Sequence, residues 1–229
     1  MKNILLFTLA AIVLLPARAQ KIIEKHLEYK AGGSVRMDFQ ISDSIRIITW
    51  SKNEVYIRSS ININDNQNND EYAMTFDGSG NGVEIRGKLD CKEGRGRRIT
   101  LRKDSASKGD NCCCCNSYSE IIHEVYIPEG SDFSVETING NIVITGKPGA
   151  VRAHTISGYI DLAVAPERAG SVEMRTISGM MYSNYDFPAD VHKTRRVGGG
   201  NVSVELNGGM GKRIDLETIS GDIFFRKAS

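Results

Sequence analysis

The chain has 229 residues, of which 40% are hydrophobic and 25% are charged, and its formal net charge at pH 7 is +1. A charge so close to balance creates no field of one sign, so the composition does not predict binding to nucleic acid or to a charged membrane surface. Glycine is frequent, with 23 residues, whereas there are only 5 prolines. Many glycines with few prolines and aromatics are typical of short strands joined by tight turns, so an all-β protein is expected.

Residues 1–19 have the form of a secretory signal peptide. A positive charge precedes an apolar run over residues 4–15, and residues 17–19 (Ala-Arg-Ala) resemble a cleavage site ahead of Gln20. The run is shorter than the roughly 20 residues that a transmembrane helix needs, and no second run follows. We therefore expect cleavage between Ala19 and Gln20, and export to the periplasm, the cell surface or the medium. A glutamine in place of a cysteine after the cleavage site argues against a lipid anchor.

Residues 20–123 are expected to form a less regular β region. Apolar residues alternate with polar ones at Val35, Met37 and Phe39, and similar short runs recur about every ten residues. Such alternation predicts half-buried strands. Residues 62–71 are rich in Asn and Asp and predict an exposed loop. Trp50 precedes a turn and is expected to pack at an edge of the sheet.

Residues 77–82 imitate the start of an EF-hand loop. Lys88 stands at the twelfth position, where calcium binding requires a bidentate glutamate. A turn between two strands is therefore the better interpretation.

All the cysteines of the chain belong to an insertion predicted over residues 91–115: Cys91, Cys112, Cys113, Cys114 and Cys115. Export would place them where disulfides persist, so one structural disulfide between Cys91 and the cluster is one interpretation. The alternative is a thiolate site for Zn or Cu, because soft sulfur ligands suit both metals. The spacing lacks the usual Cys-x-x-Cys form, so the expectation is that the chain has no cofactor, with Zn or Cu on these cysteines as the alternative.

The same insertion is basic, through Lys92, Arg95, Arg97, Arg98, Arg102, Lys103 and Lys108. In an exported protein, anionic components of the envelope are more available partners than nucleic acid. The alternative is a solvated loop or edge strand whose charges discourage aggregation.

The second half of the chain, residues 124–229, is a repeat. Gly140, Gly158, Gly179, Gly200 and Gly221 lie 18, 21, 21 and 21 residues apart, and four of them close the phrase Thr-Ile-(Ser or Asn)-Gly. A fixed period near 20 residues is typical of a solenoid. The fourth unit is irregular, since Lys193, Arg195 and Gly198 occupy positions that are otherwise apolar.

Apolar residues recur at positions −7, −5, −2, +2 and +4 from the glycine in every unit except the fourth, apart from Ser183 at +4 of the third. Because side chains in a strand alternate with period 2, these positions cannot share one face of a straight strand, so each unit is predicted to bend at Thr-Ile-Ser-Gly. A second corner is expected near residues 146–149 or 166–170. Stacked coils of about 20–21 residues would align the isoleucines in core columns and let threonine hydroxyls bond along the stack, giving a parallel β-solenoid. A β-sandwich is the alternative.

A resemblance to a known family rests on residues 124–130 (Glu-Val-Tyr-Ile-Pro-Glu-Gly) and on residues 135–142 (Val-Glu-Thr-Ile-Asn-Gly-Asn-Ile) with their repeats. These resemble the bacterial putative adhesin family of exported proteins, over roughly residues 34–225. The resemblance implies a β-solenoid on the cell envelope with no established enzymatic activity. It carries over no functional residues.

No histidine has a sequence signature of catalysis. His26, His123, His154 and His192 are scattered, and a catalytic triad would have to be recognised by its geometry. The carboxylates of Glu136, Glu173, Asp215 and Glu217 are expected on exposed strand faces, with nothing to mark a pair for sugar hydrolysis.

The sequence thus favours a non-enzymatic exported protein, an adhesin-like or structural scaffold that binds a macromolecule of the envelope or associates with itself. The alternative is an envelope metal or redox binder that uses the cysteine cluster. A carbohydrate-active β-helix enzyme is the third hypothesis.

Overall fold

The computed structural model describes residues 20–78, 80–90, 118–187, 192–196 and 199–228. Within these residues the chain forms one 15-stranded mixed sheet and three short 3-10 helices. The predicted signal peptide, the five cysteines and the basic residues between them lie outside the described residues. The all-β class expected from the composition is confirmed.

The strands in chain order are β1 (Lys21–Glu28), β2 (Ser34–Trp50), β3 (Glu54–Ile63), β4 (Tyr72–Asp77), β5 (Gly82–Leu89), β6 (Ser119–Pro128), β7 (Asp132–Thr145), β8 (Val151–Ser157), β9 (Ile160–Val164), β10 (Ala169–Ser178), β11 (Met181–Ser183), β12 (His192–Arg196), β13 (Gly199–Glu205), β14 (Lys212–Ser220) and β15 (Ile223–Lys227). The 3-10 helices are η1 (Asn69–Glu71), η2 (Pro166–Arg168) and η3 (Asn207–Gly209). The polar stretch at residues 62–71 therefore covers the end of β3, a turn and η1. The EF-hand-like segment connects the antiparallel pair β4 and β5, as predicted.

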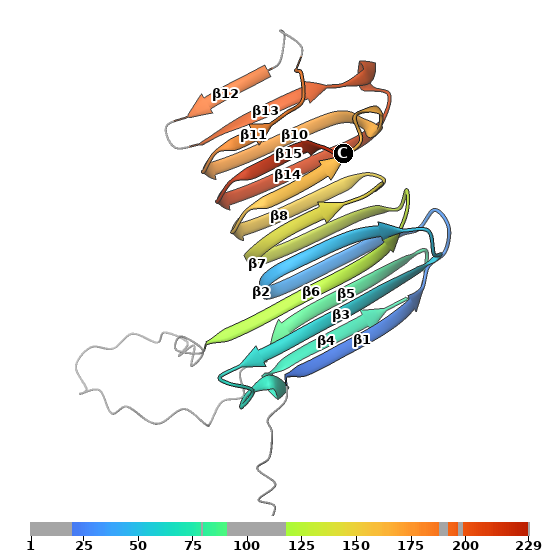
Figure 1. Ribbon diagram of the computed structural model, residues 1–229, viewed down its shortest axis with the longest axis vertical. Helices are drawn as coiled ribbons and strands as arrows, with labels where there is room; N and C mark the ends of the chain where they lie inside the picture. Colours follow the sequence, from blue (N-terminus) through green and yellow to red (C-terminus); the bar gives the residue numbers. More distant parts are fainter. Residues whose placement is uncertain (1–19, 79, 91–117, 188–191, 197–198, 229) are drawn as a thin grey trace, which may run out of the picture.

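Two long strands, β2 and β7, divide the sheet into two arms. Their first halves pair with each other and lie in the first arm, whose order is β4-β5-β2-β7-β8-β14-β10-β13-β12. Their second halves lie in the second arm, whose order is β1-β3-β6-β2-β7-β9-β15-β11. Figure 1 shows the strands crossing an elongated molecule, with β1 near one end and β12 near the other. Buried side chains of both arms form one hydrophobic cluster, so the core lies between the arms.

The expectation of a parallel β-solenoid throughout is corrected. Pairing is parallel only in the middle of the sheet, from β5 and β6 to β10 and β11, whereas both ends are antiparallel and the sheet is not closed. The units also do not stack in chain order, because β14 lies between β8 and β10.

The irregular fourth unit explains this order. Without apolar residues at the positions of Lys193, Arg195 and Gly198, it does not form a coil, and it supplies the antiparallel strands β12 and β13 instead. The last unit, which retains the apolar pattern, pairs in register with both β8 and β10. β13 then continues the first arm on the far side of β10.

The bend in each unit occurs where the glycine stands, but the inward positions differ from those expected. Positions −7, −5 and −3 face the core before the bend, and +2 and +4 face it after the bend, as in β14 and β15. The threonine at −3 is therefore buried, with Thr155 and Thr218 0% exposed. The isoleucine at −2 points outward, so the predicted isoleucine column exists on the surface and not in the core.

A polar column runs through the bends of neighbouring units. Gly140, Gly158 and Gly221 have φ angles of 136°, 140° and 153°, which side chains rarely allow. A methyl group on each would overlap the backbone carbonyl of the preceding strand in the stack. The hydroxyl of Thr155 donates to the carbonyl oxygen of Gly140 at 3.1 Å, and that of Thr218 donates to Gly158 at 3.2 Å. The threonine hydroxyls thus bond along the stack, which the sequence raised as a possibility without deciding it.

The column begins one coil earlier than the sequence suggested. β2 follows the same path as β7, with one extra residue at its bend between Ile41 and Ser44. Ser42 takes the place of the glycine, and its hydroxyl lies 3.2 Å from that of Thr137. Because the phrase Thr-Ile-Ser-Gly is missing there, the sequence placed the start of the regular stack near Glu124.

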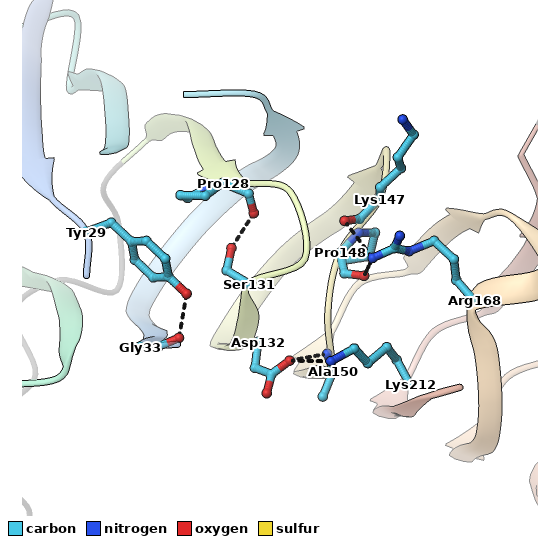
Figure 2. A network of polar contacts seen from close by, with 10 residues as sticks. All are labelled: Tyr29, Gly33, Pro128, Ser131, Asp132, Lys147, Pro148, Ala150, Arg168 and Lys212. Carbon is cyan, nitrogen blue, oxygen red and sulfur yellow. Dashed lines mark hydrogen bonds and ion pairs between the residues drawn. The ribbon is translucent and has the colours of Figure 1, made fainter. Parts of the chain in front are cut away.

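The predicted second corner consists of the loops at residues 146–150 and 165–168, which return the chain from the second arm to the first. Figure 2 shows the hydrogen bonds and ion pairs that connect these loops. The guanidinium of Arg168 donates to the carbonyl oxygen of Pro148 at 3.1 Å. The carboxylate of Asp132 accepts from the backbone N–H of Ala150 at 2.7 Å and lies 3.7 Å from the ammonium of Lys212. Contacts between successive loops therefore hold this side of the stack in register.

The glycine column predicts a large effect of a single methyl group. We expect Gly158→Ala to lower the free energy of unfolding by about 2–4 kcal/mol, because the new side chain combines an unfavourable φ with overlap on the Gly140 carbonyl. Chemical denaturation of the native chain and of the variant measures this loss. Gly78→Ala is the matched control, since nothing lies within 4 Å of a methyl group there, and a similar loss in both would contradict the role of the column.

Candidate interaction surface

Four exposed isoleucines form a column on the outer face of the first arm. They stand at position −2 in β7, β8, β14 and β10, in the order in which these strands stack. Ile138 is 43% exposed, Ile156 39%, Ile219 37% and Ile177 63%. Neighbouring strands lie about 4.8 Å apart, so the column extends for about 14 Å. Large apolar side chains in such a continuous row are unusual on a protein surface and are typical of interaction sites.

Aromatic side chains continue the apolar surface on the other side of the bend. The rings of Tyr182 and Phe224 stack at 5.1 Å with an angle of 10° between their planes. Tyr159 meets Phe224 edge to face at 6.0 Å, and Met180 is exposed beside the bend of the next unit. We call the whole set the corner surface: Ile138, Ile156, Ile219, Ile177, Tyr159, Phe224, Tyr182 and Met180.

A shallow groove of about 370 Å³ lies at the start of the isoleucine column. Ile138 and Ile156 form its apolar part, and Asp38, Glu136 and His154 form its polar part. The groove joins apolar contact area to hydrogen-bonding groups. Such a combination suits recognition of a surface on a larger molecule.

Two of the four predicted carboxylates, Glu173 and Glu217, are paired with arginines and not with each other. Glu173 lies 2.5 Å from the guanidinium of Arg175, which also lies 3.6 Å from Glu217. Arg213 lies 3.7 Å from Glu173. This network neutralises part of the outer face beside the isoleucine column.

His123 belongs to a buried polar network that the sequence analysis missed. Its Nδ1 lies 2.8 Å from the hydroxyl of Ser59, and its Nε2 lies 3.1 Å from the hydroxyl of Tyr72. The ring stacks on Phe39 at 4.1 Å. Burial lowers the pKa of His123 to about 3 and raises the pKa of Tyr72. A signal for this burial was present in the sequence, because His123 alternates in step with the apolar residues Ile121, Val125 and Ile127 along β6.

Ser59 and His123 have the spacing of a nucleophile and its base, but their position gives them a structural role. Both side chains are fully buried, and the second ring nitrogen meets a tyrosine and not a carboxylate. Gly87 makes room for the network, since a methyl group there would overlap the Tyr72 hydroxyl. The network satisfies polar groups within the core.

The other sequence candidates lie apart from one another. His26 is 3.2 Å from Glu54, and His154 lines the groove described above. His192 lies in β12. Trp50 is not at an edge of the sheet, because β2 lies in the middle of it, and its Nε1 donates to the carbonyl oxygen of Glu54 at 2.8 Å.

The metal hypothesis concerns residues that the structure does not describe. Cys91, Cys112, Cys113, Cys114 and Cys115 all lie outside the described ranges, so both the disulfide and the Zn or Cu site stay predictions. Within the described part of the chain, no three histidine, cysteine, aspartate or glutamate side chains gather in a way that could hold a metal ion. The same part contains no helix long and apolar enough to cross a membrane.

Comparison with known proteins shows a similarity of fold. No family model and no curated protein matches the sequence. A crystal structure described as a putative cell adhesion protein from Clostridium sporogenes aligns with a TM-score of 0.52 and 8% identity, over 91% of this chain and 100% of that one. A putative adhesin from Bacteroides fragilis aligns with a TM-score of 0.24 and 10% identity, over 92% of this chain and 98% of that one. The first likeness shows that the two proteins share the fold.

The buried histidine predicts a loss of stability in acid. The folded chain holds the ring neutral down to a pH of about 3, whereas the unfolded chain protonates it near pH 6.5. The stabilising contribution is therefore complete above pH 6.5 and falls as the pH is lowered from 6.5 towards 3. We expect His123→Gln to reduce the difference in unfolding free energy between pH 7.5 and pH 4.5, as measured by urea denaturation. His154→Gln is the control, because His154 lies outside the core. An unchanged difference in His123→Gln would contradict the assignment.

Proposed function

We propose that the chain is an exported, non-enzymatic protein of the cell envelope that binds a macromolecular partner in the manner of an adhesin. The observation that carries the proposal is the column of four exposed isoleucines on the corner surface. An exposed apolar row of this length has an energetic cost in water that burial against a partner would remove.

Comparison with the preceding coil supports a role of the isoleucines in binding. In β2, the strand next to β7, the residue at the same level as Ile138 is the exposed Gln40. A polar residue is therefore compatible with the bend. In the four repeat units the side chain is apolar each time, although it faces solvent.

The fold likeness to a putative cell adhesion protein supports an adhesin-like function, and the predicted signal peptide supports export. We further propose that the chain is a member of the bacterial putative adhesin family, with solenoid-like stacking of its parallel coils as a rigid frame for the corner surface. On this proposal, the partner is a macromolecule of an envelope or cell surface, and the chain needs no cofactor.

Binding by the corner surface is testable on the mature chain, residues 20–229. Beads coated with the native chain should be retained on at least one of three immobilised surfaces: bacterial envelope fragments, mucin-type glycans or extracellular matrix proteins. The triple variant Ile138→Ser, Ile156→Ser, Ile219→Ser should lower this retention at least about tenfold, because each serine removes apolar area from the contact. Its melting temperature should change little, since the side chains are exposed.

The matched control replaces three exposed residues of β8, β10 and β14 that lie outside the groove, in the variant Arg152→Ser, Ser171→Ala, Arg213→Ser. This variant should keep most of the retention. The proposal is wrong if the native chain is retained on none of the surfaces, or if both triple variants lose retention equally.

A further inference from the structure

The two arms of the sheet end unequally at the C-terminal end of the stack. The first arm continues beyond β10 through β13 to β12, whereas the second arm stops at β11 (Figure 1). Among the described strands, β11 pairs only with β15. The second arm therefore has no described strand opposite β13.

A groove of about 490 Å³ lies where that strand is missing. Its lining is mainly apolar, from Met174, Met180, Met181, Phe187 and Val202. Met174 and Val202 are paired across β10 and β13, and both belong to the core or pack against it. The groove thus extends the hydrophobic core to the end of the molecule. Gly179, Gly199 and Gly200 also line it.

The edge of β11 offers hydrogen-bonding groups to this groove. Within the β11–β15 ladder, the N–H of Ile223 donates to the carbonyl oxygen of Met180 at 2.9 Å. In a parallel pair, alternate residues direct their backbone groups to opposite sides of the strand. The N–H and carbonyl of Met181 therefore point away from β15. An exposed edge of this kind is a template for pairing with another strand.

We propose that this groove binds an extended segment of a partner polypeptide, which adds to the second arm as a strand beside β11. A polypeptide backbone supplies donors and acceptors at the spacing of the β11 edge, and main-chain bonds of this kind provide affinity in known strand additions. Side chains at alternate positions of the segment would enter the groove.

The charge of the groove restricts the partner further. None of the residues that line it is charged, so an inward-facing charge on the segment would lose its hydration without compensation. The segment must therefore be uncharged and apolar at alternate positions. Methionine side chains adapt to different shapes, so the groove tolerates several apolar residues at each place.

The test uses a synthetic peptide with the sequence of β9, residues 160–164, and blocked ends, because this strand of the second arm has the uncharged, apolar residues Ile160, Leu162 and Val164 at alternate positions. Fluorescence anisotropy measures its binding to the mature chain, residues 20–229. We expect saturable binding, and at least about tenfold weaker binding of the same peptide with N-methyl groups on alternate amides. The modified peptide keeps every side chain but loses backbone donors, so equal binding would show adsorption to an apolar surface and would overturn the proposal.

Two variants locate the site. Met181→Pro removes the outward N–H of β11 and should weaken peptide binding about tenfold, whereas Met181→Leu keeps it and should bind normally. Absence of peptide binding to the native chain would overturn the proposal. So would concentration-dependent dimerisation that Met181→Pro abolishes, because the occupant would then be a second copy. The triple isoleucine variant should bind the peptide normally, so failure here is separate from failure of the corner surface.

Discussion

The close approach of neighbouring backbones at the glycine bends is the constraint on which the rest of the structure depends. At Gly140, Gly158 and Gly221, a carbonyl of one strand occupies the space where a side chain of the next would stand. The buried threonine three residues before the bend glycine donates its hydroxyl to such a carbonyl. Because the regular units bend at the same level, β8, β14 and β10 pair in register from Val151, Ile214 and Val172 to the bend, and each regular unit supplies one strand to each arm.

The same constraint creates the corner surface. Once the threonine faces the core, alternation along the strand directs the following isoleucine to solvent. Stacking then places four such isoleucines in one row, and the residues after the glycine add Tyr159, Tyr182 and Phe224 on the other side of the bend. Within the repeated phrase, the threonine and the glycine are required by the fold. The isoleucine between them is exposed and is therefore available for binding, and it is present in every regular unit.

The irregular fourth unit decides how the stack ends. Its polar residues prevent a further coil, so the segment forms the hairpin of β12 and β13 and adds to the first arm alone. The second arm then ends at the short strand β11, which leaves its edge and the adjoining core accessible. The departure from the repeat, rather than the repeat itself, therefore produces the second candidate binding site.

Much of the local structure was predictable from the sequence. The period of 18 to 21 residues predicted the bends and the inward positions −7, −5, +2 and +4, because these depend on alternation within a strand and on the conformational freedom of glycine. The resemblance to the putative adhesin family implied a β-solenoid, and only its all-β class and the parallel stacking in the middle of the sheet agree with the structure. The coil in β2 was missed because Ser42 replaces the glycine.

Only the tertiary structure decided which strands are neighbours and which face of each bend is buried. The position of the last unit between β8 and β10 depends on pairing between distant segments, which a period along the chain does not specify. Ile177 points outward because the inward-facing positions change from odd to even only at the glycine of the bend. The apolar character of a residue does not indicate where that change occurs. The sequence by itself therefore determined the repeating unit and its corner, whereas the stacking of the units determined the surface, because exposure is a property of the neighbours that a residue acquires.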